Sequence, residues 1–237
     1  MKKRFYGKGI PGIDTEELKG SLIVIEGGDG AGRSTQIALL KSYIERRGFP
    51  CAETGLKRST LVGPELGAAM QGNTLLPITF SLFYATDLAD RLENNIIPAL
   101  RAGFVVLADR YIYTPMVRDI VRGVRPDWVR DVYSMALVPD LTIYLKASPK
   151  VLAARSFHKT GTLDYWESGM DIQASGDMYQ CFIRYQGWCQ KEFNQMIPEY
   201  DFKVVDGNRT PSGVQKEIRG LVDDLLRPKG ERVASAG

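Results

Sequence analysis

The chain has 237 residues, of which 44% are hydrophobic and 10% aromatic, and this is enough apolar material for the core of one compact domain. Its formal net charge is only +3 and its basic residues are scattered, which argues against a nucleic-acid-binding protein. The three cysteines and the single His158 lack the spacing of a zinc site or a CxxC motif, so we expect reduced, mostly buried thiols.

The opening twenty residues are polar and contain several glycines. They have no apolar central region, and apolar runs elsewhere are only strand-length, so we expect no secretory signal, no membrane span and a cytoplasmic location. This extension is either a disordered arm or an edge contact in a dimer.

A short strand, a glycine-rich turn and a helix follow the extension. "LIVIE" (22–26) is apolar and ends at a glycine cluster, and "STQIALLKSYIERRG" (34–48) has apolar residues at helical spacing before Gly48. The sequence therefore predicts a strand, a tight loop and a helix in that order.

Strands and helices alternate along the rest of the chain. The further predicted strands are "PCAET" (50–54), "FVVLADR" (104–110), "PDLTIYLKA" (139–147) and "FKVVDG" (202–207). The further predicted helices are 78–103 with a bend near Pro98, 126–137, 148–156 with Ser148 as N-cap, and 210–226. Because the strands are almost continuously apolar and alternate with helices, we expect an α/β fold with a parallel sheet covered on both faces.

One further stretch, "YQCFIRYQGWCQKEF" (179–193), carries aromatic residues and cysteines at helical spacing. Core packing or a dimer seam explains this pattern better than a cofactor site.

A candidate phosphate-binding loop lies between the first strand and its helix. The pattern G-x-x-x-x-G-[K/R]-[S/T] is matched by Gly27, Gly28, Asp29, Gly30, Ala31, Gly32, Arg33 and Ser34. The glycines let backbone N–H groups turn inward around phosphates, and the helix N-terminus adds positive potential. Ser34 is a candidate Mg²⁺ ligand and Thr35 can supplement the helix cap. An ordinary glycine-rich turn would share the pattern, but the flanking elements favour phosphate binding.

Arg33 occupies the position at which such loops carry lysine. A lysine ammonium is a compact point charge, whereas a guanidinium is planar and favours bidentate contacts. The charge is kept, so we expect nucleotide binding; a site that binds without catalysing is the alternative.

Asp109 and Arg110 directly follow the predicted strand 104–110. They are expected at the carboxyl edge of the sheet beside the loop, where open α/β sheets bind ligands. Asp109 is a candidate Mg²⁺ ligand and Arg110 a candidate phosphate clamp. An isolated loop ion pair is the alternative for this dipeptide.

With these motifs the chain resembles the thymidylate kinase family of P-loop nucleoside monophosphate kinases. The resemblance spans nearly the whole chain, and its marks are "IEGGDGAGRSTQ" (25–36), Arg58 in "KRST", "LFYATD" (82–87), "IIPALRAGFVVLADRY" (96–111) and "PDLTIYL" (139–145). It implies the three-layer P-loop NTPase fold, a parallel five-stranded sheet of order 2-3-1-4-5, a mobile lid after "VLAARS" and a homodimer. It also implies transfer of the γ-phosphoryl group of ATP, with Mg²⁺, to a nucleoside monophosphate, with dTMP as the leading candidate.

The resemblance also implies roles for individual residues. On the acceptor side, Asp29 lies near the nucleotide, Arg58 and Arg110 hold its phosphate as charge-assisted clamps, and Tyr84 stacks on its base. On the donor side, Arg155 flanks adenine, and the loop 206–210, with Asn208 and Arg209, closes over it.

The sequence departs from the family at the acceptor base. Leu88 stands where the family has its base-reading arginine, and Pro115 and Met116 stand where it offers hydroxyl or amide donors to thymine. We therefore expect Leu88, Tyr113 and Met116 to bind the acceptor through a more apolar pocket, with weaker discrimination between bases.

It departs again at the catalytic arginine that family members carry in the loop or in the lid. The loop has Gly30 at that position, and the lid offers only His158 and Lys159 beyond Arg155. Arg33 is therefore a candidate for both roles, as loop cation and as catalytic arginine. His158 is better interpreted as a solvated residue than as a general base, and the acidic "DYWE" (164–167) as a hinge of the lid.

We thus predict an N-terminal extension (1–20), one P-loop kinase domain (21–228) with a lid at about 156–170, and a flexible tail (229–237). Two alternatives stay open: a kinase of this fold with another phosphorylated or small acceptor, and a nucleotide-binding regulatory module that has lost catalysis.

Overall fold

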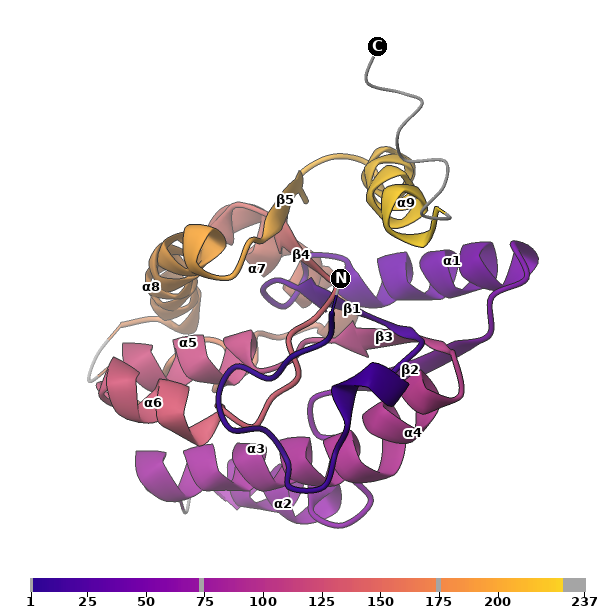
Figure 1. Cartoon of the computed structure of the whole chain (residues 1–237). Coiled ribbons are helices and arrows are strands. Elements are labelled where there is room, and N and C mark those ends of the chain that lie inside the picture. Colours follow the sequence, from indigo (N-terminus) through magenta and orange to yellow (C-terminus); the bar gives the residue numbers. More distant parts are fainter. Residues whose placement is uncertain (1, 73–74, 174–175, 228–237) are drawn as a thin grey trace.

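The computed structural model describes residues 2–72, 75–173 and 176–227, so the predicted tail 229–237 lies outside the described residues. Within these ranges the chain forms a five-stranded sheet of order β2-β3-β1-β4-β5 in which all neighbouring strands are parallel (Figure 1). The strands are β1 (Ser21–Glu26), β2 (Cys51–Gly55), β3 (Val105–Asp109), β4 (Leu141–Lys146) and β5 (Lys203–Asp206). The predicted fold class and strand order are therefore confirmed.

Helices occupy both faces of this sheet. They are α1 (Arg33–Arg46), α2 (Gly63–Gly72), α3 (Pro77–Arg91), α4 (Ile97–Arg101), α5 (Tyr113–Val121), α6 (Pro126–Val132), α7 (Pro149–Thr160), α8 (Met178–Glu199) and α9 (Pro211–Leu226), with a short 3-10 turn η1 (Thr15–Glu17). In Figure 1, α1 and α9 lie above the sheet, and α3 and α4 lie below it. Among the described residues, no helix is both long and apolar enough to cross a bilayer.

The long helix predicted over 78–103 is interrupted near the expected place. α3 ends at Arg91, a π-helical turn η2 (Leu92–Ile96) follows, and α4 begins directly after it. Pro98 in the first turn of α4 has no N–H to donate to the carbonyl four residues earlier. The wider π turn accommodates the missing hydrogen bond, so the bend precedes the proline.

Alternate residues of the central strands build two cores, one on each face of the sheet. Leu22 and Val24 of β1 face a cluster with α3, α4, α5, α6 and α8, whereas Ile23 and Ile25 face a cluster with α1, α7 and α9. Neighbouring side chains of a strand point to opposite faces. This explains why a strand buried on both sides is apolar at nearly every position.

The extension at residues 2–20 packs on the chain's own core. Phe5 forms an isolated antiparallel bridge with Leu137, and the Tyr6 hydroxyl lies 2.5 Å from that of Tyr113. The ring of Tyr6 also meets that of Tyr200 edge to face, with ring centroids 5.4 Å apart. These contacts order the segment, in contrast to the disordered arm that its composition allows.

Two local predictions about α7 and α8 are confirmed. The Ser148 side chain caps α7 by accepting a hydrogen bond from the Val151 backbone, with Pro149 in the first turn. In α8, Cys181 and Cys189 are buried, and no disulfide joins cysteines in the described part of the chain. The helical spacing of "YQCFIRYQGWCQKEF" thus reflects packing against the sheet.

Candidate active site

The predicted phosphate loop connects β1 to α1 and has the left-handed backbone that its glycines permit. Gly30 has φ +83°, and Gly32, the N-cap residue of α1, has φ +93°. Ser34 and Thr35 are exposed in the first turn of α1, where backbone N–H groups have no partner within the helix. The turn therefore presents an anion-binding helix N-terminus to solvent.

A cavity of about 500 Å³ opens over this helix N-terminus. It is within the usual size range of small-molecule sites. It is lined by loop and α1 residues (Asp29, Gly30, Ala31, Gly32, Arg33, Ser34, Thr35 and Gln36), by α7 (Arg155 and Lys159) and by the segment after β5 (Gly207, Arg209, Pro211 and Val214). Most of the predicted donor-site residues thus line one cavity, whereas Gly27, Gly28 and Asn208 are not among its lining residues.

Arg155 and the segment after β5 hold one another in place. The Arg155 guanidinium donates to the carbonyl oxygens of Gly207 (2.7 Å) and Asn208 (3.4 Å). The Asn208 side chain accepts from the Ser148 backbone at 3.0 Å and donates to Asp206 at 2.7 Å. Asn208 therefore supports the rim of the cavity by fixing this segment against α7.

Gly30 is packed directly beneath α7. A Cβ atom at this position would lie 2.6 Å from the Leu152 carbonyl oxygen and 3.0 Å from the Ser156 hydroxyl. A longer side chain here would therefore collide with α7, which explains physically why this loop carries no arginine at the position.

Gly30→Ala is expected to weaken ATP binding at least about tenfold, because the left-handed backbone and the contact with Leu152 each strain an alanine, at about 1–3 kcal/mol for the backbone alone. Isothermal titration calorimetry measures the effect. The matched control is Gly187→Ala in α8, where an added Cβ meets nothing within 4 Å. Equal ATP affinity in the Gly30 variant and the control would contradict the expectation.

Arg33 turns back beneath the loop and is almost fully buried. Its Nε donates to the Asp109 carboxylate at 2.7 Å, its Nη1 to the carbonyl oxygens of Gly27 and Gly28, and its Nη2 lies 3.4 Å from the Asp29 carboxylate. All three guanidinium nitrogens are thus used by acceptors of the chain itself. Arg33 fastens the loop to the end of β3, which a single ammonium group could not do in the same way.

Asp29 and Arg110, which are predicted to lie on the acceptor side of the loop, form an ion pair. Arg110 Nη2 lies 3.0 Å from Asp29 Oδ1. Burial alone would raise the pKa of Asp29, but the positive charges of Arg110, Arg33 and Arg118 hold it well below its usual range. The carboxylate is therefore charged throughout the physiological pH range.

The turn that carries Arg110 is organised by Glu26 at the end of β1. Arg110 itself adopts the left-handed backbone with φ +65°, which is uncommon for a side-chain-bearing residue. The fully buried Glu26 carboxylate accepts from the Tyr111 backbone (2.9 Å) and from the backbone and hydroxyl of Thr114. Burial raises the pKa of Glu26, and the Thr114 and Tyr111 hydrogen bonds oppose this rise. A strained residue held by its surroundings is common at functional sites.

The remaining residues predicted on the acceptor side differ in exposure. Arg58 is exposed after β2, and its Nε would lie 3.4 Å from a Cβ built on Gly55, so it folds back toward the end of that strand. Leu88, Met116 and Tyr113 are core residues with at most 1% of their surface exposed. They pack in the core beside the acceptor side, and their role in binding the acceptor stays a prediction.

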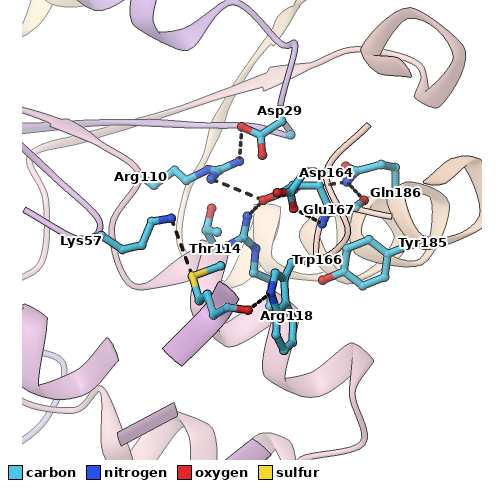
Figure 2. A network of polar contacts seen from close by, with 12 residues as sticks. Asp29, Lys57, Arg110, Thr114, Arg118, Asp164, Trp166, Glu167, Tyr185 and Gln186 are labelled. Carbon is cyan, nitrogen blue, oxygen red and sulfur yellow. Dashed lines mark hydrogen bonds and ion pairs between the residues drawn. The ribbon is translucent and has the colours of Figure 1, made fainter. Parts of the chain in front are cut away.

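Four residues that the sequence did not single out as acceptor-side residues belong to the polar network that includes Arg110 (Figure 2). Arg118 of α5 forms a buried ion pair with Glu167, and Arg110 Nη1 lies 3.7 Å from the same Glu167 oxygen. Gln186 of α8 donates to the Glu167 backbone carbonyl at 2.9 Å. Trp166 donates to the Met70 carbonyl at 2.7 Å and stacks on Phe80 with ring centroids 5.3 Å apart. Residues 166 and 167 of "DYWE" therefore reach the acceptor side, which an interpretation of this stretch as a hinge does not anticipate.

Comparison with known proteins places these features in context. The sequence model of the family described as Thymidylate kinase matches residues 25–218. A protein named probable thymidylate kinase 2 from Saccharolobus solfataricus is 37% identical over 88% of this chain and 98% of its own length. A thymidylate kinase from Caldicellulosiruptor saccharolyticus is 29% identical over 90% of this chain and 100% of its own, and a probable thymidylate kinase from Caldivirga maquilingensis is 27% identical over 86% and 94%.

Proposed function

The chain belongs to the thymidylate kinase family, and from this premise we propose that it transfers the γ-phosphoryl group of ATP to dTMP, yielding ADP and dTDP. The observation that carries the proposal is the arrangement around residues 27–34. On one side lies the cavity lined by Arg155, and on the other lies the Asp29–Arg110 ion pair. The two sides offer separate anion sites for a donor and an acceptor.

On the donor side, the helix N-terminus and the inward-turned loop backbone bind the ATP phosphates. Arg155 and Arg209 line the same cavity and contact the adenine end of ATP, and Asn208 holds Arg155 through its carbonyl oxygen. Arg33 keeps the loop in its binding shape by donating to the carbonyl oxygens of Gly27 and Gly28.

On the acceptor side, Arg110 holds the dTMP phosphate and Asp29 orients Arg110 through their 3.0 Å ion pair. An oxygen of this phosphate attacks the γ-phosphorus of ATP as the bond from the γ-phosphorus to the ADP oxygen breaks. Such transfers depend on positioning and on charge stabilisation, with little covalent work for the protein. The arginines therefore contribute by placing the acceptor in line.

Ser34 and Asp109 offer a hydroxyl and a carboxylate oxygen, the donor types that suit Mg²⁺. When bound, the ion neutralises charge on the donor phosphates. Mg²⁺ commonly binds through one or two carboxylates together with substrate phosphates and water. Arg33 and the ion would share the Asp109 carboxylate, so we infer that Asp109 fixes the loop and the ion together.

We also propose a homodimer and a cytoplasmic location. Exposed apolar side chains, Leu76, Ile78 and Leu82, lie at the start and on the outer surface of α3 and support association with a second copy. Static light scattering tests the dimer, and a monomer at micromolar concentration would contradict it.

The function is tested by ADP production from ATP and Mg²⁺ with a panel of nucleoside monophosphates that includes dTMP. The highest kcat/KM is expected for dTMP, and Asp109→Ala is expected to abolish it. A higher kcat/KM for another acceptor would mean that the acceptor pocket has a different specificity. ATP binding without turnover on any acceptor would instead support a regulatory module.

A further inference from the structure

Arg118 is a buried cation for which the mechanism above has no use. It lies on α5, eight residues after Arg110 in the sequence, and only 9% of its surface is exposed. Its guanidinium contacts the Glu167 carboxylate and also donates to the Tyr84 hydroxyl at 3.4 Å. Arg118 is therefore linked through Glu167 to Arg110, the proposed phosphate-binding residue (Figure 2). It is linked directly to Tyr84, the residue expected to stack on the acceptor base.

The charges around Arg118 are arranged for an incoming anion. Arg110 and Arg118 both approach the same oxygen of the Glu167 carboxylate. The pKa of Lys57 is lowered mainly by burial of its ammonium group and further by the positive charges of Arg118 and Arg110. Asp29 already pairs with Arg110 and Arg33. Glu167 is thus the group that neutralises the mutual repulsion of Arg110 and Arg118.

The Glu167 carboxylate leaves part of the hydrogen-bonding capacity of the two arginines unused. Arg110 Nη1 lies 3.7 Å from its oxygen, beyond hydrogen-bond distance, and the buried Arg110 Nε has no partner among the described residues. A phosphate dianion has three oxygens and about twice the charge of a carboxylate, so it can satisfy both guanidiniums at once. The neighbouring Trp166 stacks on Phe80, so residues 166 and 167 together place an aromatic ring and an anion beside one another, as a nucleoside monophosphate does.

We propose that Arg118, together with Arg110, binds the phosphate group of the nucleoside monophosphate acceptor. In the absence of the acceptor, the Glu167 carboxylate pairs with the two arginines, and the acceptor phosphate displaces it. The inference rests on the proposed function for the identity of the acceptor. Glu167, at the end of the stretch 164–167, thus competes with the acceptor phosphate for the two arginines.

The first test measures binding of dTMP and of thymidine by calorimetry for the wild type and for Arg118→Met. Because a buried charged partner of the phosphate is lost, dTMP is expected to bind at least about 30-fold more weakly, whereas thymidine binding stays within about twofold. Arg118→Lys is expected to lie between the two, since it keeps the charge but not the fork. Arg130→Met, which removes an exposed ion pair with Glu199, is the matched control.

The second test is Glu167→Gln, which leaves both arginines in place and keeps the side-chain shape. Removing the competing charge is expected to lower KM for dTMP about threefold or more, with KM for ATP unchanged. A raised KM for dTMP would overturn the role of Glu167 as a competitor, and this variant decides the matter if Arg118→Met does not fold.

The two proposals fail in different ways. Unchanged dTMP binding in a folded Arg118→Met protein that still phosphorylates dTMP would overturn the inference and leave the function intact. A wild type that is inactive on dTMP but binds another monophosphate in an Arg118-dependent way would overturn the function and support the inference.

Discussion

Replacing Arg33 by methionine is expected to lower kcat/KM for dTMP phosphorylation by at least about a hundredfold, the cost of misplacing reacting groups by about 1 Å. The change removes the partner of Asp109 and the hydrogen bonds to the Gly27 and Gly28 carbonyl oxygens. The partly buried Asp109 carboxylate loses its partner, and the loop loses its attachment to β3. Coupled ADP production measures the loss, and calorimetry with ATP shows whether the donor still binds.

The substitution Arg33→Lys keeps the positive charge at this position but removes the planar guanidinium group. One ammonium group cannot reach Asp109 and two backbone carbonyls in the way the guanidinium does, so we expect a loss of about tenfold. A turnover higher than that of the wild type would refute the hypothesis that Arg33 serves both as loop cation and as catalytic arginine. Arg46→Met, at the exposed far end of α1, is the control and is expected to be as active as the wild type.

Replacing Asp87 by alanine is expected to reduce the free energy of unfolding by about 3–5 kcal/mol, the usual cost of breaking a buried ion pair. Asp87 and Arg91 are both fully buried in α3 and pair at 2.9 Å. The same carboxylate accepts from the backbone N–H groups of Lys57 (3.2 Å) and Ser59 (2.9 Å). Urea denaturation followed by circular dichroism measures the change.

The Asp87 prediction has a control on the same helix. Asp90→Ala removes a partner only from the exposed Asn94 side chain and is expected to change stability by less than about 0.5 kcal/mol. Because Asp87 holds the turn that bears Arg58, its loss is also expected to raise KM for dTMP. A loss below about 1 kcal/mol would show that the buried pair contributes little.

The strands and the phosphate loop could be predicted because their signals are local. The apolar run 22–26 followed by glycines fixes a buried strand and a turn by steric and solvation rules that act over a few residues. The strand order came instead from the family resemblance, since periodicity does not say which parallel strands pair. The structure confirms the predicted strands and their order.

The acceptor side could not be predicted in the same way, because it depends on the tertiary packing of distant segments. Arg118 and Glu167 are 49 residues apart, and nothing in either local sequence indicates that they meet. Leu88 and Met116 were placed by counting along motifs, but a helical residue faces the core or the site according to the rotation of its helix. In the structure that rotation turns both toward the core.

The central position of β1 has a consequence for the synthesis of this chain. β1 is made first, but its partners β3 and β4 begin at residues 105 and 141, so its first neighbour follows about 80 residues later. At about 5–20 residues per second, the ribosome takes roughly 4–16 s to supply it. During that interval an apolar strand with unpaired edges is exposed to other nascent chains. Chaperone capture of translation intermediates that end between β1 and β3 is therefore expected, and it should fall once β4 has emerged.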